Sequence, residues 1–234
     1  GDVSGKKAYL NTEKFQVTLT PKGNAPHPMM FVKLSVPLFM GANNLDPVDQ
    51  DDVKAVLKGL EADLREKGIS CDLDQARVNR VDTFRNIQTD EYFPSYSPVF
   101  DLMRAKRTQT RDYGTTRTWM NSQQEFTAYD KVKEMEMKGA DVSGLPNLTR
   151  FEYRVKKARK VRDVYGFEHV ADIISEYGSI MDVYRKAMSE NLFRVDIEGH
   201  SIQTGESIRD ELLYFMDTGG KHWLGNYFKA RGVH

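Results

Sequence analysis

The segment LTRFEYRVK, residues 148–156, decides the fold because its side chains alternate strictly between apolar and polar. Successive side chains of a β-strand point to opposite faces, so this alternation predicts a strand with one buried face. The buried face is expected to carry Phe151, Tyr153 and Val155. The opposite face is expected to carry Arg150, Glu152, Arg154 and Lys156.

A second strand is predicted for QEFTAYDK, residues 124–131, which alternates in the same way. Its apolar side carries Phe126 and Ala128. Its polar side carries Glu125, Thr127, Tyr129 and Lys131. A third strand, RVNRVDTF at residues 77–84, adds Arg80 and Asp82. If these strands share a sheet, their polar faces form one surface.

The N-terminal part of the chain predicts a hairpin followed by a helix. Residues 15–20 and 30–36 alternate with a period of two, and the turn-forming stretch PKGNAPHP separates them. From Asp49 the period becomes helical, with acidic residues in the first turn and Gly68 at the expected end. The apolar stripe of this helix consists of Val53, Val56, Leu57, Leu60 and Leu64.

Helices dominate the rest of the prediction. Ser97 and Pro98 open a helix expected to run to about residue 107, and KKARKVRDVYG predicts a basic helix that ends at Gly166. Further helices are predicted near residues 168–177, 179–190, 206–216 and 221–231. We therefore expect an α+β fold in which a central, mainly antiparallel sheet has helices on one face. This domain would span residues 1–166, with a helical C-terminal region at 167–234.

Composition argues against a disordered chain and a membrane span. Hydrophobic residues make up 39% of the 234 residues, enough for a sizeable core. The longest apolar stretch, residues 29–40, is interrupted by Lys33 and Pro37 and is shorter than the ~20 residues that cross a bilayer. The single cysteine, Cys71, fits a reducing compartment. Because the first residues also show no apolar leader, we expect a cytoplasmic protein.

Charge is balanced overall but clustered locally. The chain has 34 basic and 34 acidic residues, yet residues 150–162 contain seven basic residues and one acidic residue. The basic residues of this first cluster are Arg150, Arg154, Lys156, Lys157, Arg159, Lys160 and Arg162. A second cluster consists of Arg104, Lys106, Arg107 and Arg111. Two separated basic clusters in a neutral chain indicate a surface that attracts a polyanion, although each alone also fits a solvated helix face.

The polar strand faces contain the groups of a phosphoryl-transfer site. Asp82 and Glu152 supply hard oxygen ligands that suit Mg²⁺ or Mn²⁺, and such an ion polarises a phosphoryl oxygen. Tyr129 is the candidate nucleophile, provided that a nearby cation counters its ordinary pKa of ~10. Lys131 points the same way along the predicted strand and could supply that charge.

Arg150 and Arg154 are expected to grip the phosphate in bidentate fashion. The other predicted DNA contacts are Arg80, Lys156, Lys157, Arg159, Lys160, Arg104, Lys106 and Arg107. Alternation alone also fits a solvated sheet face held by cross-strand ion pairs, without any chemistry. Two roles are also open for Trp119, which could pack in the core or stack on an unpaired base.

Three motifs follow one another along the chain. They are ISCDLDQARVNRVDTF at 69–84, TRTWMNSQQEFTAYDKVKE at 116–134 and LPNLTRFEYRVKKARKVRDVYG at 145–166. In this order they resemble the replication initiators of filamentous phages, the gene II/gene X family of phage and plasmid replication proteins. The resemblance covers roughly residues 30–166.

The resemblance implies a rolling-circle initiator with an HUH/Rep-like nicking fold. Members of the family nick one strand of origin DNA through a tyrosine, leave a phosphotyrosyl link and a free 3′ hydroxyl, and later rejoin the displaced strand. The family's tyrosine falls on Tyr129 and its acidic positions fall on Asp82 and Glu152, the residues that alternation also selects. The implied partners are origin DNA and the helicase and polymerase of a bacterial host cell.

Several questions stay open at this point. The histidines include no His-hydrophobic-His pair that could bind the metal. The third metal ligand is therefore left open, with Glu125 and Glu134 as the two candidates. A metal-dependent nuclease would let water attack while Tyr129 only positions it. A mobilisation relaxase would run the same chemistry on different DNA. A non-catalytic origin-binding protein would use the basic clusters alone.

Overall fold

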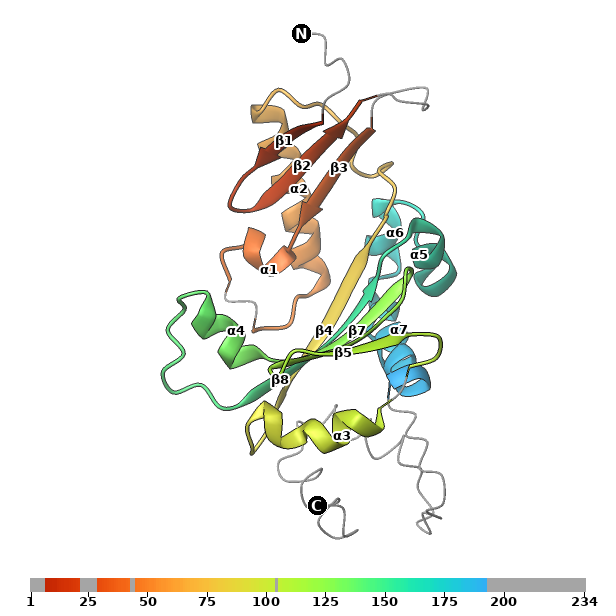
Figure 1. The fold of residues 1–234 in the computed structure, drawn as a ribbon. Helices are drawn as coiled ribbons and strands as arrows, with labels where there is room; N and C mark the ends of the chain where they lie inside the picture. Colours follow the sequence, from red (N-terminus) through yellow and green to blue (C-terminus); the bar gives the residue numbers. More distant parts are fainter. Residues whose placement is uncertain (1–6, 22–28, 43–44, 104, 193–234) are drawn as a thin grey trace. The chain divides into compact units, whose positions relative to one another are not determined.

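A computed structural model describes residues 7–21, 29–42, 45–103 and 105–192 (Figure 1). The chain divides into two compact units, one ending at Leu73 and one beginning at Asp74. Each unit contains an antiparallel sheet and helices, which confirms the expected α+β class. The single central sheet that we expected is replaced by two separate sheets, of three and five strands.

The first unit is a three-stranded sheet packed on a helix. Its strands are β1 (Ala8–Asn11), β2 (Phe15–Thr20) and β3 (Met29–Leu34), in the order β1-β2-β3, and its helices are α1 (Val36–Phe39) and α2 (Gln50–Glu66). Phe15 and Val17 on β2 pack against Leu60 and Leu64 of α2. The Asp49 side chain caps α2 in a capping box with Asp52, as the acidic first turn predicts. The strands and helix predicted here are confirmed, whereas the four-residue β1 was not predicted.

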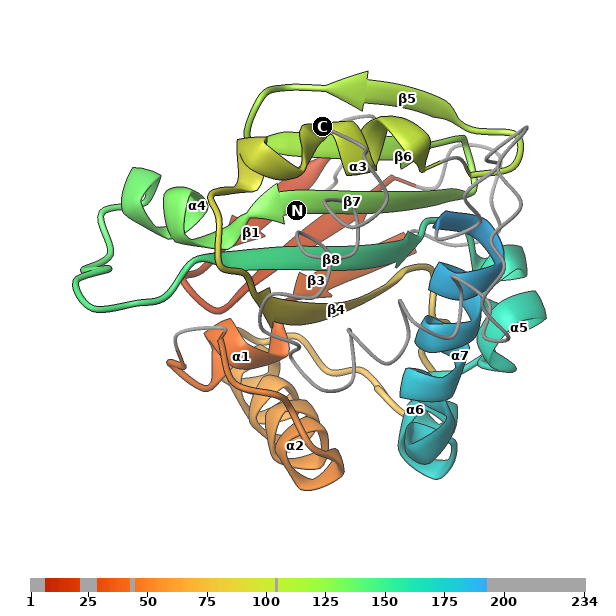
Figure 2. The same ribbon diagram turned by 90° about the horizontal axis from the view of Figure 1, so that it is seen from below.

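The second unit is built on a five-stranded antiparallel sheet. The strands are β4 (Val81–Gln88), β5 (Gln109–Asp112), β6 (Thr116–Met120), β7 (Gln124–Asp130) and β8 (Leu148–Val155). Their order across the sheet is β4-β8-β7-β6-β5, which Figure 2 shows. The two strands predicted from strict alternation, β7 and β8, therefore lie side by side at its centre.

The predicted strand at residues 77–84 was placed too early, because β4 begins at Val81 and continues to Gln88. Arg85 and Asn86 interrupt the apolar alternation, which hid the second half of the strand. Arg77, predicted to open it, forms only an isolated bridge with His169. The hairpin of β5 and β6 was not predicted.

Helices of the second unit are short. They are α3 (Ser97–Leu102) after the 3-10 helix η1 (Phe93–Tyr96), α4 (Lys131–Met137), α5 (Ala158–Tyr165), α6 (Val170–Ser175), the 3-10 helix η2 (Tyr177–Ser179), α7 (Ile180–Ala187) and the π-helical turn η3 (Met188–Leu192). α3 ends at Leu102 and not near residue 107, so its predicted length was wrong. α5 is closed by Gly166 in the left-handed conformation, so the predicted glycine end is confirmed. The helices expected at 206–216 and 221–231 lie outside the described residues. None of the helices in the described part of the chain combines the length and the apolar character that a membrane span needs.

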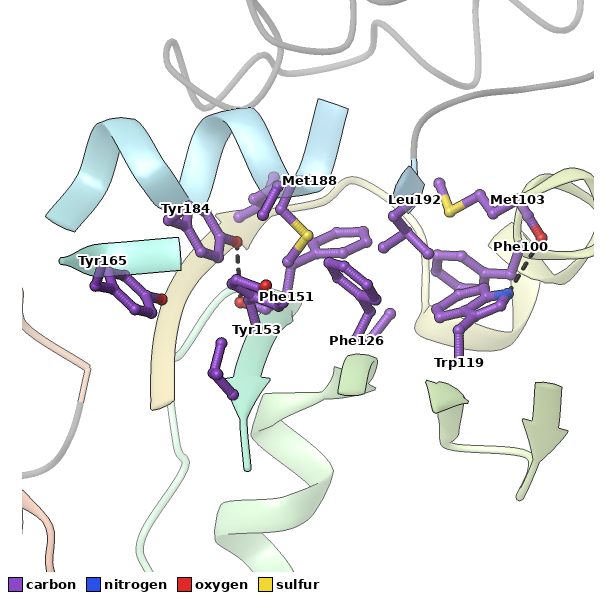
Figure 3. Packing of buried hydrophobic residues seen from close by; sticks show 14 of the residues in the cluster. Phe100, Met103, Trp119, Phe126, Phe151, Tyr153, Tyr165, Tyr184, Met188 and Leu192 are labelled. Atoms are coloured by element: carbon purple, nitrogen blue, oxygen red, sulfur yellow. Dashed lines mark hydrogen bonds between the residues drawn. The ribbon is translucent and has the colours of Figure 1, made fainter. Parts of the chain in front are cut away.

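One apolar core joins the sheet to helices α3, α5 and α7 (Figure 3). The Tyr184 hydroxyl on α7 donates to the Phe151 carbonyl oxygen at 3.0 Å, which fixes α7 to β8. Trp119 is fully buried and donates to the Met103 carbonyl oxygen at 3.1 Å, so it packs in the core. Tyr184 and Leu192 belong to the same buried cluster as Phe151, so a boundary between residues 166 and 167 would cut through this core.

Tyr153 provides a test of this core. Burial raises its pKa to about 12, and its hydroxyl donates to Gln124 Oε1 at 3.1 Å. The folded protein therefore holds this proton more tightly than the unfolded chain, whose tyrosine pKa is ~10. The resulting stability is fully present below about pH 10 and is lost as the pH rises through about 12. We expect Tyr153 to account for a loss of about 2 kcal/mol in the free energy of unfolding over that window.

Urea unfolding of the wild type and of Tyr153→Phe at about pH 8 and about pH 11.5 measures this loss. The variant should show a smaller decrease between the two pH values than the wild type. Identical decreases in both proteins would show that Tyr153 does not hold its proton more tightly when folded.

Candidate functional site

The strand register places the predicted site residues on one face of the five-stranded sheet. The residues aligned across β4, β8 and β7 form three rows, since residues directly opposite in a sheet share a face. The ion-pair row is Asp82, Arg154 and Glu125; the middle row is Phe84, Glu152 and Thr127; the tyrosine row is Asn86, Arg150 and Tyr129. The intervening Phe126, Phe151 and Tyr153 belong to the core. Asp82, Tyr129 and Glu152 therefore lie on the same side, opposite the core.

Arg154 is the centre of the ion-pair row. Its Nε donates to Asp82 Oδ2 at 3.0 Å, its Nη1 to Glu125 Oε1 at 2.5 Å and its Nη2 to Glu152 Oε1 at 2.9 Å. Every nitrogen of the guanidinium thus donates to a different carboxylate. Arg154 was expected to grip phosphate, but its donors are directed at these three acids.

Two further cations flank the same acids. Arg80 donates to both oxygens of Asp82 at 2.8 and 2.5 Å, and Lys156 Nζ lies 3.2 Å from Glu125 Oε2. Three cations, Arg80, Arg154 and Lys156, thus face three carboxylates. The alternative that the sequence left open, a sheet face held by cross-strand ion pairs, describes the ion-pair row well.

Glu152 is less exposed than Asp82, the other acid that the sequence selected as a metal ligand. Its pKa is raised, first by burial and also by the negative charge of Asp82, whereas Arg154 and Arg150 lower it. Arg154 therefore offsets part of the cost of keeping this carboxylate charged.

The carboxylates around Arg154 fit Mg²⁺ or Mn²⁺ in their chemistry, because both ions prefer carboxylate oxygens. The sequence left Glu125 and Glu134 open as a third ligand, and the structure places Glu125 beside Asp82 and Glu152. Glu134 instead pairs with Lys131 and Lys138. Within the described residues, His, Cys, Asp and Glu form no group of three or more that is arranged to hold a metal. A guanidinium lies between the three acids, so an ion would have to compete with Arg154.

Arg150 holds the tyrosine row together. It is 2% exposed, its Nε donates to Asn86 Oδ1 at 2.7 Å, and its guanidinium carbon lies 3.9 Å from the centre of the Phe84 ring. The same carbon lies 6.0 Å from the centre of the Tyr129 ring. Arg150 lies opposite Tyr129 on the neighbouring strand, so a group so buried is placed to act on the Tyr129 phenol rather than to grip DNA from the surface.

Tyr129 is mostly buried at the end of β7. The pKa of its phenol is raised to about 12, chiefly by burial and also by the charges of Glu152 and Glu134, against the charge of Arg150 and a hydrogen bond with Arg150, which both lower it. Arg150 is thus the cation that favours the phenolate. Lys131, expected in this role, begins α4, and its Nζ donates to Glu134 at 2.6 Å. Burial lowers the pKa of Lys131.

The three predicted catalytic groups are unequally spaced. Glu152 lies one row from Tyr129 on the neighbouring strand, and its charge acts on the phenol. Asp82 lies two rows away and two strands across, which in regular sheet geometry is about 13 Å along the strands and about 10 Å across them. The site is therefore elongated, with Tyr129 at one end and Asp82 at the other.

Arg150 and Arg154 of the first basic cluster lie in these rows, whereas the residues of the clusters that follow Lys156 or precede β5 lie outside them. Lys157 precedes α5, whose outward residues include Arg159, and Arg159 Nε lies 4.0 Å from Asp163. Lys157 and Arg159 are exposed, and Lys160 is half-buried. Lys106 and Arg107 are exposed in the turn before β5, whereas Arg104 lies outside the described residues.

Sequence reasoning missed Phe84 and Asn86 as neighbours of the candidate site. Both alternate with Asp82 at a spacing of two, so a correct placement of β4 would have put them on the polar face. The guanidinium of Arg150 needs both of them, because Phe84 covers its plane and Asn86 accepts its Nε proton.

The chain was compared with known proteins at three levels. No family model matches it, and neither a curated protein nor a solved structure does.

Proposed function

We propose that this protein is a rolling-circle replication initiator that nicks and rejoins one strand of origin DNA through a phosphotyrosyl link to Tyr129. The observation that supports this most is the register that places Tyr129, Glu152 and Asp82 on one polar face. These are the positions that the gene II/gene X resemblance assigns. The proposal includes an HUH/Rep-like nicking fold, because the five-stranded sheet carries helices on its apolar face and the tyrosine on the other.

The proposed reaction is a reversible transesterification. The Tyr129 phenol loses its proton, and its oxygen forms a bond to a phosphorus of the DNA backbone. The bond from that phosphorus to the 3′ oxygen breaks, and the 3′ oxygen takes up a proton to become a free hydroxyl. Arg150 stabilises the phenolate from within the sheet, because its charge and its hydrogen bond both lower the pKa of Tyr129.

The proposed cofactor is Mg²⁺ or Mn²⁺, held by Asp82, Glu125 and Glu152 in competition with Arg154. Glu152 is the one of these acids whose row adjoins that of Tyr129 on the neighbouring strand, so an ion held at Glu152 would be the one to offset negative charge that develops on the phosphoryl group. The three carboxylates all contact the guanidinium of Arg154, which supports their choice as ligands, and the ion would have to displace that guanidinium to be held by them.

The proposed nicking can be tested without knowledge of the origin sequence. Single-stranded oligonucleotides of randomised sequence that carry a label at the 3′ end are incubated with the protein and Mg²⁺, Mn²⁺ or EDTA, and the products are separated on a denaturing gel. The proposal expects labelled DNA that stays attached to protein through its 5′ end and becomes free after proteolysis. Cleaved DNA without any attached protein would instead favour the nuclease in which water attacks.

The basic residues around α5 are proposed to contact the DNA backbone. Each phosphate contact with a single strand contributes about 0.7 to the slope of log affinity against log salt. We expect simultaneous charge reversal of Lys157, Arg159 and Lys160 to Glu to weaken binding to all sequences and to flatten this slope by up to about 2. Lys133→Glu on α4 is the matched control, because Lys133 is exposed and pairs with Glu136. An unchanged slope in the triple variant would remove α5 from the DNA interface.

A second candidate function is a non-catalytic origin-binding protein. The observation that favours it is the saturation of Arg154 by three carboxylates, which is what a purely structural ion-pair network would show. This candidate predicts that Asp82→Ala and Glu152→Ala leave DNA binding intact and that no divalent ion supports cleavage. The nicking proposal predicts cleavage by the wild type and its loss in both variants.

The biological setting belongs to the same proposal. A replication initiator of this kind would act in the cytoplasm of a bacterial host, with the host helicase and polymerase extending the free 3′ end. A mobilisation relaxase would differ only in the DNA that it cleaves.

A further inference from the structure

The first unit's sheet has two exposed aromatic rings in one row. Tyr9 on β1 lies opposite Thr18 on β2, and Thr18 lies opposite Phe31 on β3. Val17 and Val32 next to this row pack into the core with α2, so Tyr9, Thr18 and Phe31 face the other way. Tyr9 is 65% exposed and Phe31 is 43% exposed. Thr18 between them is half-buried, so the two rings are the exposed side chains of this row.

The same strand face is basic. Lys33 is exposed two residues beyond Phe31 on β3, and exposed Lys7 lies two residues before Tyr9. Neither lysine forms an ion pair with any residue that the structure describes. The three strands contain no Asp or Glu, and Lys33 is their one charged residue. The helix α2 on the other face contains five acidic residues and three basic ones, so its net charge is negative. The two faces of the first unit therefore differ in the sign of their net charge.

Rings and cations in this arrangement suit unpaired nucleotides. Base-stacking on aromatic side chains works for any sequence, and a basic surface beside the rings attracts the backbone. Tyr9 and Phe31 are separated by two strand spacings, about 10 Å. Neighbouring bases of a duplex are ~3.4 Å apart and have no free faces, so only an extended single strand can place bases on both rings. A protein partner would require a contiguous apolar patch, which Thr18 and Lys33 interrupt.

We propose that this face binds single-stranded DNA, with one base stacked on Tyr9, another on Phe31, and the backbone against Lys33. The inference deepens the proposed function and rests on it for the choice of DNA, because nicking followed by strand displacement produces a single strand. It assigns the first unit the task of holding that strand.

Binding is measured with the full chain, a fluorescent oligothymidine of about 12 nucleotides and EDTA, so that no cleavage occurs. Tyr9→Ala and Phe31→Ala should each weaken binding about fivefold or more, and Phe31→Tyr should retain the wild-type affinity. Lys33→Ala should reduce the salt slope by about 0.7. Leu38→Ala is the matched control, since Leu38 is 55% exposed in the same unit but lies on α1.

Two results would overturn the inference. Unchanged affinity in Tyr9→Ala and Phe31→Ala, with unchanged thermal midpoints, would show that the rings do not stack on bases. Loss of self-association in sedimentation, at unchanged DNA affinity, would assign the face to a second copy of the chain. Failure of the nicking proposal is distinguishable, because binding is measured in EDTA without cleavage: affinity that depends on Tyr9 and Phe31, together with no covalent product in the cleavage assay, would reject nicking and keep this inference.

Discussion

Tyr129→Phe should abolish strand cleavage and the covalent protein–DNA product, with a loss of about a thousandfold or more in rate. The substitution removes only the hydroxyl oxygen that forms the bond to phosphorus. Tyr113→Phe is the matched control, because Tyr113 is exposed and lies in the hairpin between β5 and β6. Single-turnover cleavage on denaturing gels measures both variants. Full cleavage by Tyr129→Phe would exclude Tyr129 as the nucleophile.

The pH dependence of the same reaction follows from the burial of Tyr129. Its phenol has a pKa of about 12, so the phenolate fraction rises about tenfold per pH unit between about pH 7 and 9. The cleavage rate should follow this rise without a plateau. Arg150→Gln removes the charge that lowers this pKa, so the variant should cleave more slowly at every pH in the range. A pH-independent wild-type rate would contradict this role for the phenol.

Arg154→Ala should lower the free energy of unfolding at pH 7 by about 2 to 3 kcal/mol. The Arg154 side chain is 26% exposed and donates to three carboxylates, which would be left without this partner. The control is Arg159→Ala, since the Arg159 side chain is exposed and pairs with Asp163 at the surface of α5. Such pairs contribute about 0 to 1 kcal/mol. Chemical denaturation of both variants gives the comparison.

The defect of Arg154→Ala should disappear in acid. Arg154 lowers the pKa of Glu152 against the burial that raises it, so removing Arg154 raises that pKa further. A raised carboxyl pKa gives a stability contribution that is present below the unfolded value, about 4.3, and is lost as the pH rises through the folded value. The wild type and Arg154→Ala should therefore converge near about pH 3 to 4. An equal defect at pH 7 and at pH 4 would rule out carboxylate repulsion as its cause.

Mn²⁺ provides a second readout of the same variant. If the ion and the guanidinium compete for Asp82, Glu125 and Glu152, millimolar Mn²⁺ should raise the thermal midpoint of Arg154→Ala more than that of the wild type. Its affinity for the variant, measured by electron paramagnetic resonance, should be about tenfold higher or more. Adding Asp82→Asn and Glu152→Gln should remove this effect. Equal affinity in the wild type and Arg154→Ala would show that the two cations do not share a site.

The sequence predicts the centre of the second unit well, because alternation there is strict. The strands predicted at residues 148–156 and 124–131 match β8 and β7, except that each observed strand ends one residue earlier. The predicted position of β4 was too early in the sequence, because Arg85 and Asn86 break the apolar alternation of the strand. β5 has all four residues exposed, so it has no buried face for a pattern to reveal.

The candidate site could be predicted only as a shared face. Alternation settles which face of the sheet Tyr129 and Glu152 occupy. Which side chains on that face contact one another depends on the register between paired strands, and alternation within one strand does not give that register. Arg150 and Arg154 therefore looked equivalent in the sequence. Pairing opposite Asn86 buries the first beside Tyr129, and pairing opposite Asp82 places the second among three carboxylates.

Peptide mapping of the protein–DNA product tests the central proposal most directly. The protein is trapped on a cleaved oligonucleotide and digested with protease and nuclease, and the nucleotide-bearing peptide is sequenced by mass spectrometry. The account predicts a nucleotide phosphate on Tyr129, within the β7 segment QEFTAYD. A phosphate on any other residue, or cleaved DNA with no modified peptide, would contradict it.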